Sequence, residues 1–216
     1  MGKLFVITGA NKGLGLDLVK DASNKAFKVE GVGKSAKSEN IPIDVPFTQL
    51  DCSQYAGVLE FWKKINEKYD KEYHVVLVNN AGTYYKKEFL KMPIEDIESL
   101  LRDNLLTSIY MTRGVLDFFD QITIVNIVSV SAIEPGANKA IYGAAKAAML
   151  SFFNSLRLEL KDRKVKIINI NPHTINTWSP NKEPNAIESR DLADWIIDLS
   201  VQERTFEIRD AVLLPF

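Results

Sequence analysis

The architecture of this chain follows from its residues 4–15, Leu4-Phe5-Val6-Ile7-Thr8-Gly9-Ala10-Asn11-Lys12-Gly13-Leu14-Gly15. The first four are a continuous apolar run, as expected for a strand buried on both faces. A glycine-rich turn follows, and Leu14, Leu18 and Ala22 then recur at helical spacing. Such a strand, turn and helix N-terminus together predict an anion site, because backbone N–H groups converge there and glycines let a pyrophosphate approach. The spacing Gly-x-x-x-Gly-x-Gly differs from the commoner Gly-x-Gly-x-x-Gly, and a bare turn is the alternative.

Apolar runs continue to alternate with amphipathic segments along the rest of the chain. They predict further strands at residues 27–32, 47–50, 74–78, 122–128, 165–170 and 206–214. Helical patterns lie between them, most clearly over residues 93–119 and 140–160. This alternation predicts an α/β fold, a doubly wound Rossmann-type parallel sheet of about seven strands with helices on both faces. The length of 216 residues predicts a single domain, 1–216.

Composition argues against several classes of protein. The formal charge, 27 − 28 = −1, gives no reason to expect nucleic acid or an anionic membrane as a partner. One cysteine, Cys52, excludes an internal disulfide and fits a reducing compartment. That cysteine and two histidines cannot supply a His/Cys zinc cluster. With no signal peptide and no segment of transmembrane length, we expect a cytoplasmic protein without a bound metal.

The end of the second predicted strand bears on the choice of nucleotide. A site for NAD is expected to place an acidic residue there, to hold the adenosine ribose hydroxyls. The chain instead has Gly33, Lys34 and Ser35, with Lys12 in the glycine-rich turn. Two ammonium groups and a hydroxyl suit a 2′-phosphate and favour NADP. The alternative is that both lysines are solvated surface residues, and the role of Glu30 in the same strand stays open.

Polar residues also gather where other predicted strands end. Asn79-Asn80-Ala81-Gly82 follows the fourth strand, Ser129 the fifth, and Pro172-His173-Thr174-Ile175-Asn176-Thr177 the sixth. Ligands of open α/β sheets bind outside the carboxyl ends of the strands. We therefore expect these segments to surround one site together with residues 8–15. The alternative for the asparagines and glycines is that they simply form turns.

Tyr142 and Lys146 lie in the alanine-rich segment 140–160. If that segment is helical, the two side chains are one turn apart on the same face. A nearby ammonium favours the phenolate and lowers the tyrosine pKa from about 10, which suits general acid–base catalysis. In most helices such a pair serves only packing and solvation. Asn104 lies inside the predicted helix 93–119, where asparagine is a poor helix former; an exposed surface amide is the alternative to a site residue.

Taken in order, these motifs resemble the short-chain dehydrogenase/reductase family over nearly the whole chain. The matching pieces are Thr8-Gly9-x-x-x-Gly13-x-Gly15, Asp51, Asn79-Asn80-Ala81-Gly82, Asn104, Ser129, Tyr142-x-x-x-Lys146 and residues 172–177. The interval from Ser129 to Tyr142, 142 − 129 = 13, is typical of the family. Gly33-Lys34 resembles the pair found in members that prefer NADP. The resemblance implies an oxidoreductase that transfers a hydride between NADP(H) and a small carbonyl or alcohol substrate.

The resemblance also implies a role for each residue. Tyr142 would exchange a proton with the reacting oxygen, Ser129 would hydrogen-bond that oxygen, and Asn104 would order a water behind Lys146. Lys146 would lower the tyrosine pKa and hold the nicotinamide ribose. Asp51 would meet the adenine, and Ile175 and Thr177 the carboxamide region. The implied cofactor contacts are Gly9, Asn11, Lys12, Gly13, Leu14, Gly15, Lys34, Ser35, Asp51, Cys52, Asn80, Ala81, Gly82, Tyr142, Lys146, Pro172, Ile175 and Thr177.

His173 departs from the family pattern, which usually has glycine after the proline. It would lie near the nicotinamide, where it either narrows the pocket or points to solvent. Further candidates for the pocket wall are Tyr84, Tyr85, Ile133, Glu134 and Trp178. Related proteins commonly dimerise or tetramerise through the helices that correspond to residues 93–119 and 140–160, so we expect a homodimer or homotetramer. The alternative function is an NADP(H)-binding sensor or scaffold without turnover.

Overall fold

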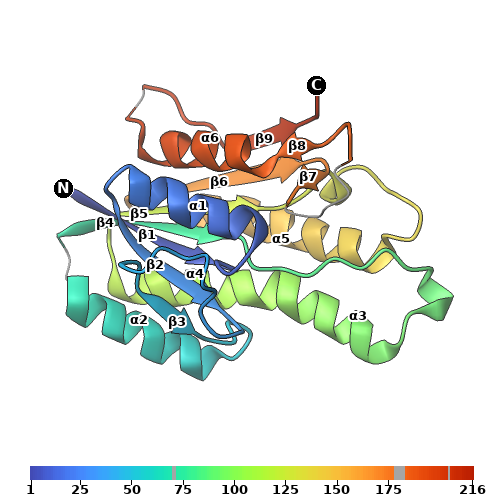
Figure 1. Ribbon diagram of the computed structural model, residues 1–216, viewed down its shortest axis with the longest axis horizontal. Helices are drawn as coiled ribbons and strands as arrows, with labels where there is room; N and C mark the ends of the chain where they lie inside the picture. Colours follow the sequence, from blue (N-terminus) through green and yellow to red (C-terminus); the bar gives the residue numbers. More distant parts are fainter. Residues whose placement is uncertain (70–71, 178–182, 204) are drawn as a thin grey trace.

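A seven-stranded parallel sheet forms the centre of the computed structural model, which describes residues 1–69, 72–177, 183–203 and 205–216. Its strand order is β3-β2-β1-β4-β5-β6-β9 (Figure 1). The strands are β1 (Gly2–Thr8), β2 (Lys28–Gly33), β3 (Phe47–Gln49), β4 (Tyr73–Asn79), β5 (Ile122–Ile127), β6 (Val165–Pro172) and β9 (Asp210–Leu213). A separate two-stranded sheet pairs β7 (Ile175–Asn176) with β8 (Ile187–Glu188). The predicted fold class is confirmed.

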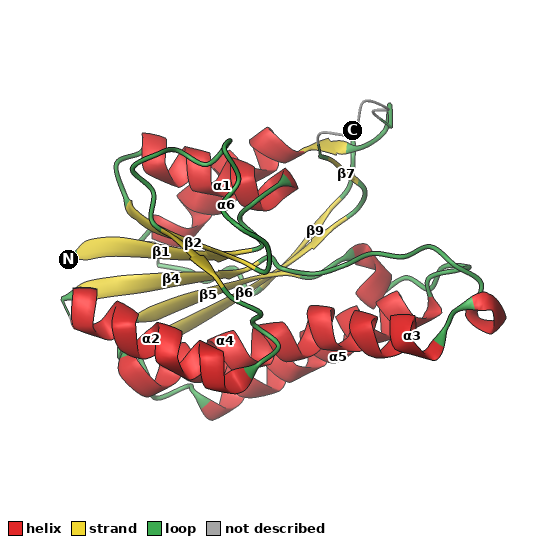
Figure 2. Ribbon diagram, turned by 60° about the horizontal axis from the view of Figure 1, so that its bottom comes forward, coloured by secondary structure: helices red, strands yellow, loops and turns green. Residues whose placement is uncertain are grey.

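Helices cover both faces of the sheet, as Figure 2 shows. One face carries α1 (Gly13–Asn24) and α6 (Ser189–Val201), and the other carries α2 (Tyr55–Tyr69), α4 (Thr107–Phe118) and α5 (Ala140–Glu159). None of the helices in the described part of the chain is both long and apolar enough to cross a membrane.

The apolar run of β1 explains how the two layers hold together. Leu4 and Val6 belong to the core cluster under α2, α4 and α5, whereas Phe5 and Ile7 belong to the one under α1 and α6. All four side chains are fully buried. Strand side chains alternate between the two faces of the sheet, so every residue of a continuous apolar run is buried in one of the two core clusters. Burial of such a side chain contributes roughly 1.5–3 kcal/mol.

Two predicted elements differ from the observed ones. The predicted helix 93–119 is α3 (Ile94–Leu101), a π-helical turn (Arg102–Leu106) and α4. The Asn104 amide accounts for the break, since it donates to the Leu100 carbonyl oxygen at 3.0 Å and to the Thr83 carbonyl oxygen at 2.8 Å. The last strand is shorter than the predicted 206–214, because pairing with β6 begins at Asp210.

A row of polar side chains runs from β4 to the edge strand β9. Asn79, Asn126, Asn169 and Asp210 are register partners on β4, β5, β6 and β9. Asn79 donates to Asn126 at 2.9 Å, Asn126 donates to Asn169 at 2.9 Å, and Asn169 donates to Asp210 at 2.8 Å. Each amide in this row would be costly to bury without its neighbour. The row therefore favours one register of these strands.

The strand order also locates a binding crevice. The chain runs outward from β1 through β2 to β3 and then returns to the other side of β1 as β4. Adjacent connections consequently leave the carboxyl ends of β1 and β4 in opposite directions. In open α/β sheets such a switch point is where ligands bind.

Candidate active site

Two adjoining cavities open at this edge of the sheet. One, of about 570 Å³, is lined by the glycine-rich turn, the segment after β4 and part of β7. The other, of about 330 Å³, lies between the ends of β4, β5 and β6 and the start of α5. Both are lined by Asn80, Gly82, Tyr84, Ile127 and Ile175. Fifteen of the predicted site residues line one or both: Gly9, Lys12, Gly13, Leu14, Gly15, Asn80, Ala81, Gly82, Asn104, Ser129, Tyr142, Lys146, Pro172, Ile175 and Thr177.

The glycine-rich turn is shaped by two requirements on its backbone. Gly9 has a φ of +67° and Gly13 a φ of 56°, in the left-handed region that favours glycine. At Gly15 an added Cβ would lie 2.2 Å from the Gly9 carbonyl oxygen, so only glycine fits. The first N–H groups of α1 are thus presented to the larger cavity without side chains in front of them. This cradle fits the pyrophosphate of a dinucleotide.

Hydrogen bonds fasten this turn to the segment after β4. The Thr8 hydroxyl accepts from the backbone N–H groups of Asn80 and Ala81, both at 3.0 Å, and donates to the Val78 carbonyl oxygen at 3.2 Å. The Asn80 amide returns a hydrogen bond to the Thr8 carbonyl oxygen at 2.9 Å. These hydrogen bonds therefore tie the two ligand-facing loops to each other.

Five predicted cofactor residues lie outside the two cavities, around the end of β2. The Asn11 amide donates to the Ser35 hydroxyl at 2.8 Å and to the Ala36 carbonyl oxygen at 2.9 Å, which holds the loop after β2 against the glycine-rich turn. Lys34, with 67% of its side chain exposed, pairs with Asp51 at 3.1 Å. Hydrogen bonds from Ser53 and Lys34 lower the pKa of Asp51 against the opposing effect of burial. Asp103 also lies 4.0 Å from the Lys34 ammonium, so two acids already partly neutralise this cation.

The side chains of Cys52 and Glu30 are buried in the protein interior. The Cys52 thiol is buried in the core cluster under α2, and burial raises its pKa to about 12. A contact between Cys52 and a nucleotide would therefore come from its backbone. Glu30, whose role the sequence left open, is buried and accepts from the Lys68 ammonium and the Tyr69 hydroxyl, both at 2.7 Å.

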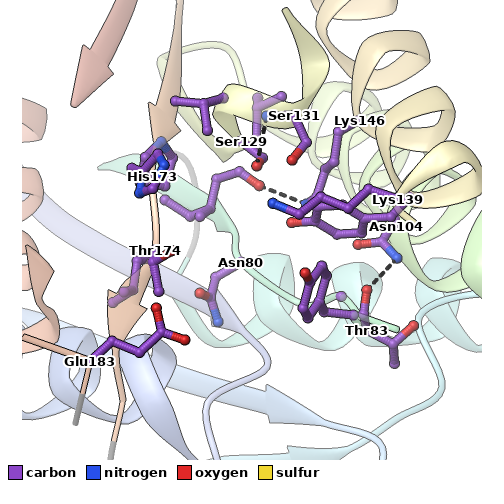
Figure 3. Close-up of a pocket in the computed structure, with 18 residues that line it drawn as sticks. Asn80, Thr83, Asn104, Ser129, Ser131, Lys139, Lys146, His173, Thr174 and Glu183 are labelled. Carbon is purple, nitrogen blue, oxygen red and sulfur yellow. Dashed lines mark hydrogen bonds between the residues drawn. The ribbon is translucent and has the colours of Figure 1, made fainter. Parts of the chain in front are cut away.

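Ser129 and Tyr142 both line the smaller cavity. Ser129 follows β5 and accepts from the Ser131 backbone N–H at 3.1 Å (Figure 3). Tyr142 lies in the first turn of α5, and its ring packs edge-on against Tyr84 with centroids 4.9 Å apart. Burial raises the pKa of Tyr142, and a hydrogen bond from Ser129 opposes that shift. Burial thus sets the direction of the shift in the protein alone, and a lowering of the tyrosine pKa by Lys146 stays a prediction.

Lys146 is the most deeply buried cation of the site, with 4% of its surface exposed. Its ammonium donates to the Ile127 carbonyl oxygen at 2.9 Å and lies 5.8 Å from the centroid of the Tyr142 ring. Burial lowers the pKa of Lys146 to about 8. The lysine is thus held by a backbone carbonyl behind the tyrosine rather than on its hydroxyl.

Asn104 completes this group and is buried, so the alternative of an exposed amide is wrong. Its Nδ2 is held by the Thr83 and Leu100 carbonyl oxygens, while its Oδ1 is buried without a hydrogen-bond partner in the described structure. A Cβ added to Gly82 would lie 2.5 Å from that Oδ1 and 3.7 Å from the Lys146 ammonium. The two polar groups therefore converge on the same glycine. An unpaired buried acceptor of this kind is suited to an ordered water.

Comparison with known proteins decides the family. The sequence profile described as short chain dehydrogenase matches residues 3–186. The chain belongs to the short-chain dehydrogenase/reductase family. It is therefore an NAD(P)-dependent oxidoreductase by family.

Two curated relatives and one solved structure illustrate the likeness. This short-chain dehydrogenase/reductase is 30% identical to a 3-oxoacyl-[acyl-carrier-protein] reductase of Buchnera aphidicola, over 83% of the chain and 76% of the relative. It is 28% identical to an NADP-dependent 3-hydroxy acid dehydrogenase of Schizosaccharomyces pombe, over 99% of the chain and 93% of the relative. It superposes on the closed form of serine dehydrogenase complexed with NADP⁺ with a TM-score of 0.86, at 23% identity and covering 98% and 94% of the two chains.

The wall of the smaller cavity differs in part from the expectation for this short-chain dehydrogenase/reductase. Tyr84 and His173 line it, whereas Tyr85, Ile133 and Glu134 do not. Trp178 lies outside the described residues. Thr174, in the expected segment 172–177, also contributes to the wall, and the sequence reasoning missed Thr83, Ser131, Lys139 and Glu183 (Figure 3). Thr83 and Ile127 act through backbone carbonyls, which leave no side-chain signal; Lys139 was detectable, since it precedes Tyr142 by one helical turn.

Proposed function

We propose that this protein transfers a hydride between NADP(H) and a small carbonyl or alcohol, with Tyr142 exchanging the proton. The observation that supports this most directly is that Ser129, Tyr142 and Lys146, together with Asn104, line one cavity that adjoins the glycine-rich cradle. A phenol, a hydroxyl and a buried cation at one place provide acid–base catalysis and stabilisation of charge on oxygen. The nicotinamide supplies or accepts the hydride when it is bound.

Each side chain has a task in the direction of reduction. Ser129 hydrogen-bonds the substrate oxygen and fixes it beside the phenol. The raised pKa of Tyr142 keeps the phenol protonated at neutral pH, ready to donate as charge develops on that oxygen. Lys146, largely protonated below its pKa of about 8, stabilises the phenolate that remains. The Oδ1 of Asn104, which has no hydrogen-bond partner among the described residues, would accept from a water through which the proton is replaced.

The preference for NADP rests on the corner at the end of β2. Glycines 9, 13 and 15 would surround the pyrophosphate, and Lys34 and Ser35 would meet the 2′-phosphate. The acid in β2, Glu30, is turned into the core by Lys68 and Tyr69 and does not serve the ribose. The relative from S. pombe is described as NADP-dependent, which agrees with this assignment. A bound phosphate would share Lys34 with Asp51.

Replacement of Tyr142 by phenylalanine tests the proposal. We expect Tyr142→Phe to reduce turnover of aldehydes and ketones by about 100-fold or more, since positioned acids contribute roughly 10²–10⁴. The affinity for NADPH, followed by fluorescence, should change less than about twofold because the cradle is untouched. Tyr85→Phe is the matched control, because Tyr85 follows the cavity residue Tyr84 in the chain but lines neither cavity.

Undiminished turnover of the Tyr142→Phe variant would contradict the proposal. Tight NADPH binding by the wild-type protein with no oxidation across a broad carbonyl panel, and no reduction of NADP⁺ by alcohols, would instead support a sensor or scaffold.

A further inference from the structure

We infer that the substrate of this site carries a carboxylate bound by Lys139, so that the protein acts on short hydroxy or oxo acids. The inference rests on the proposed function and narrows it to one chemical class. It is carried by a lysine that the catalytic mechanism does not use and that faces the same cavity as Ser129 and Tyr142.

Lys139 lies directly before α5, three positions ahead of Tyr142. Side chains three apart at a helix start lie on the same side, so the ammonium and the phenol reach one ligand from neighbouring points. Figure 3 shows Lys139 projecting into the cavity beside Lys146, opposite His173, Thr174 and Glu183. When the reacting oxygen of a small substrate is at Tyr142, another group of the same substrate can therefore reach Lys139.

The local backbone holds Lys139 in this place. Asn138 before it has a φ of 63°, a left-handed conformation that asparagine tolerates better than most residues. The Asn138 carbonyl oxygen accepts from the Lys87 N–H at 3.0 Å, and the Lys139 carbonyl oxygen accepts from the Gly143 N–H at 2.7 Å. The Lys139 stem crosses Gly136 so closely that a Cβ there would lie 3.3 Å from its Cδ. These contacts direct the side chain along the cavity wall.

Lys139 is half-buried as a residue, and its ammonium has no ion pair within the part of the chain that the structure describes. Partial burial of a cation without a partner is unfavourable, and a charged ligand that supplies the partner relieves it. A carboxylate would do so, whereas a neutral ketone would cover the ammonium and leave it unpaired. The lysine thus favours an anionic substrate over its neutral analogue.

The other charged groups of the cavity agree with an anion. Lys139 and Lys146 are its two cations, and Glu183 is its acidic residue among the described lining groups. Glu183 is exposed at the far wall, and its backbone is held by Asn176 through hydrogen bonds of 3.0 and 3.1 Å. His173, also exposed, is on that far side. The positive charge of the cavity therefore lies on the wall near the Tyr142 phenol, which carries Lys139 and Lys146.

Two matched pairs of substrates test the inference. NADPH oxidation is measured with acetoacetate and with its neutral amide, and with pyruvate and its amide, on the wild-type protein, Lys139→Gln, Lys139→Arg and Lys86→Gln. Hydrogen bonds to charged groups contribute about 1.5–3 kcal/mol, equivalent to roughly 10- to 100-fold. We expect Lys139→Gln to lower kcat/KM for an oxo acid by about that factor, mainly through KM, and to change the amide by less than about threefold. Lys139→Arg should retain much of the preference, and Lys86→Gln all of it.

Equal losses for acid and amide in Lys139→Gln would overturn the inference, as would a wild-type protein that prefers the amides. If neutral carbonyls are turned over as well as the oxo acids are, the proposed function stands and only the inference of a carboxylate substrate is refuted. If no compound is turned over, calorimetry of 3-hydroxybutyrate binding to the NADPH complex decides: binding that Lys139→Gln abolishes supports the carboxylate site, and absence of binding by the wild-type protein refutes it.

Discussion

The Lys146 ammonium donates a hydrogen bond of 2.9 Å to the Ile127 carbonyl oxygen at the end of β5. The contact joins α5 to the sheet at a point where the lysine is almost wholly buried. Burial lowers its pKa to about 8 from an ordinary value of 10.5, so the charged lysine lowers the stability of the folded protein at neutral pH. Such a cost is typical of a group retained for chemistry rather than for stability.

Lys146→Met should therefore separate stability from activity. Between pH 8 and 10.5 the unfolded chain binds a proton on Lys146 that the folded protein does not. The stability of the wild-type protein should therefore rise with pH across this window. Below pH 8 the folded protein bears the full cost of a buried charge. That penalty is about 3 kcal/mol, against about 1 kcal/mol for the lost hydrogen bond. We expect a higher Tm at pH 7 in calorimetry and turnover reduced about 100-fold or more. A lower Tm, with Lys161→Met unchanged as the surface control, would contradict this.

Gly82→Ala should disable the site through Asn104. The new Cβ would lie 2.5 Å from the Asn104 Oδ1, so the amide must leave its place between Thr83 and Leu100. We expect a loss of stability of about 1–3 kcal/mol and a large fall in kcat. The double variant Gly82→Ala/Asn104→Ala should regain stability without regaining turnover. Recovery of both would show that Asn104 has only a structural role.

Two changes at the end of β2 should shift cofactor preference in opposite directions. Lys34→Gln removes the cation assigned to the 2′-phosphate and should reduce the preference for NADPH over NADH about 10-fold. Asp51→Asn removes the acid that pairs with Lys34 at 3.1 Å and should increase that preference. Lys28→Gln, at the other end of the same strand, is the control. The effect is measured as the ratio of kcat/KM with NADPH to kcat/KM with NADH. An unchanged ratio in Lys34→Gln would show that Lys34 does not bind the 2′-phosphate.

His74 should make stability depend on pH well away from the active site. It accepts from the Lys3 ammonium through Nδ1 at 3.3 Å, so it is the Nε2 nitrogen that carries the proton towards Thr123 at 2.8 Å. Burial, with Lys3 and Lys166, lowers its pKa to about 4. A folded pKa below the unfolded value of about 6.5 means that the unfolded state binds more protons. Stability should be complete above pH 6.5 and fall as the pH drops towards 4.

This His74 contribution amounts to at most about 3 kcal/mol, less whatever remaining solvent contact screens. Urea unfolding at a series of pH values measures it, with His74→Gln as comparison. The variant should have a flatter curve over pH 4–6.5. Parallel curves for the two proteins would assign the acid sensitivity to other groups.

Short-range patterns in the chain were sufficient for the architecture and for most of the site's membership. The apolar run of β1, the glycines after it and the helical repeat of α1 each depend on neighbours within a few positions, and all three appear as expected. Parallel strands must end at one edge, so Asn80, Ser129 and Tyr142 could be assigned to one place without knowledge of their contacts. Backbone freedom and periodicity are local properties, and a sequence displays them directly.

Burial and pairing depended on the assembled fold instead. The Tyr142 pKa rises because elements distant in sequence remove water from it, which the spacing to Lys146 does not reveal. The row from Asn79 to Asp210 exists only once four strands are in register. Lys139 faces a cavity, with no ion pair among the described residues, because segments from different parts of the chain line that cavity. Desolvation and hydrogen bonding are set by three-dimensional neighbours, and these come from segments tens of residues apart.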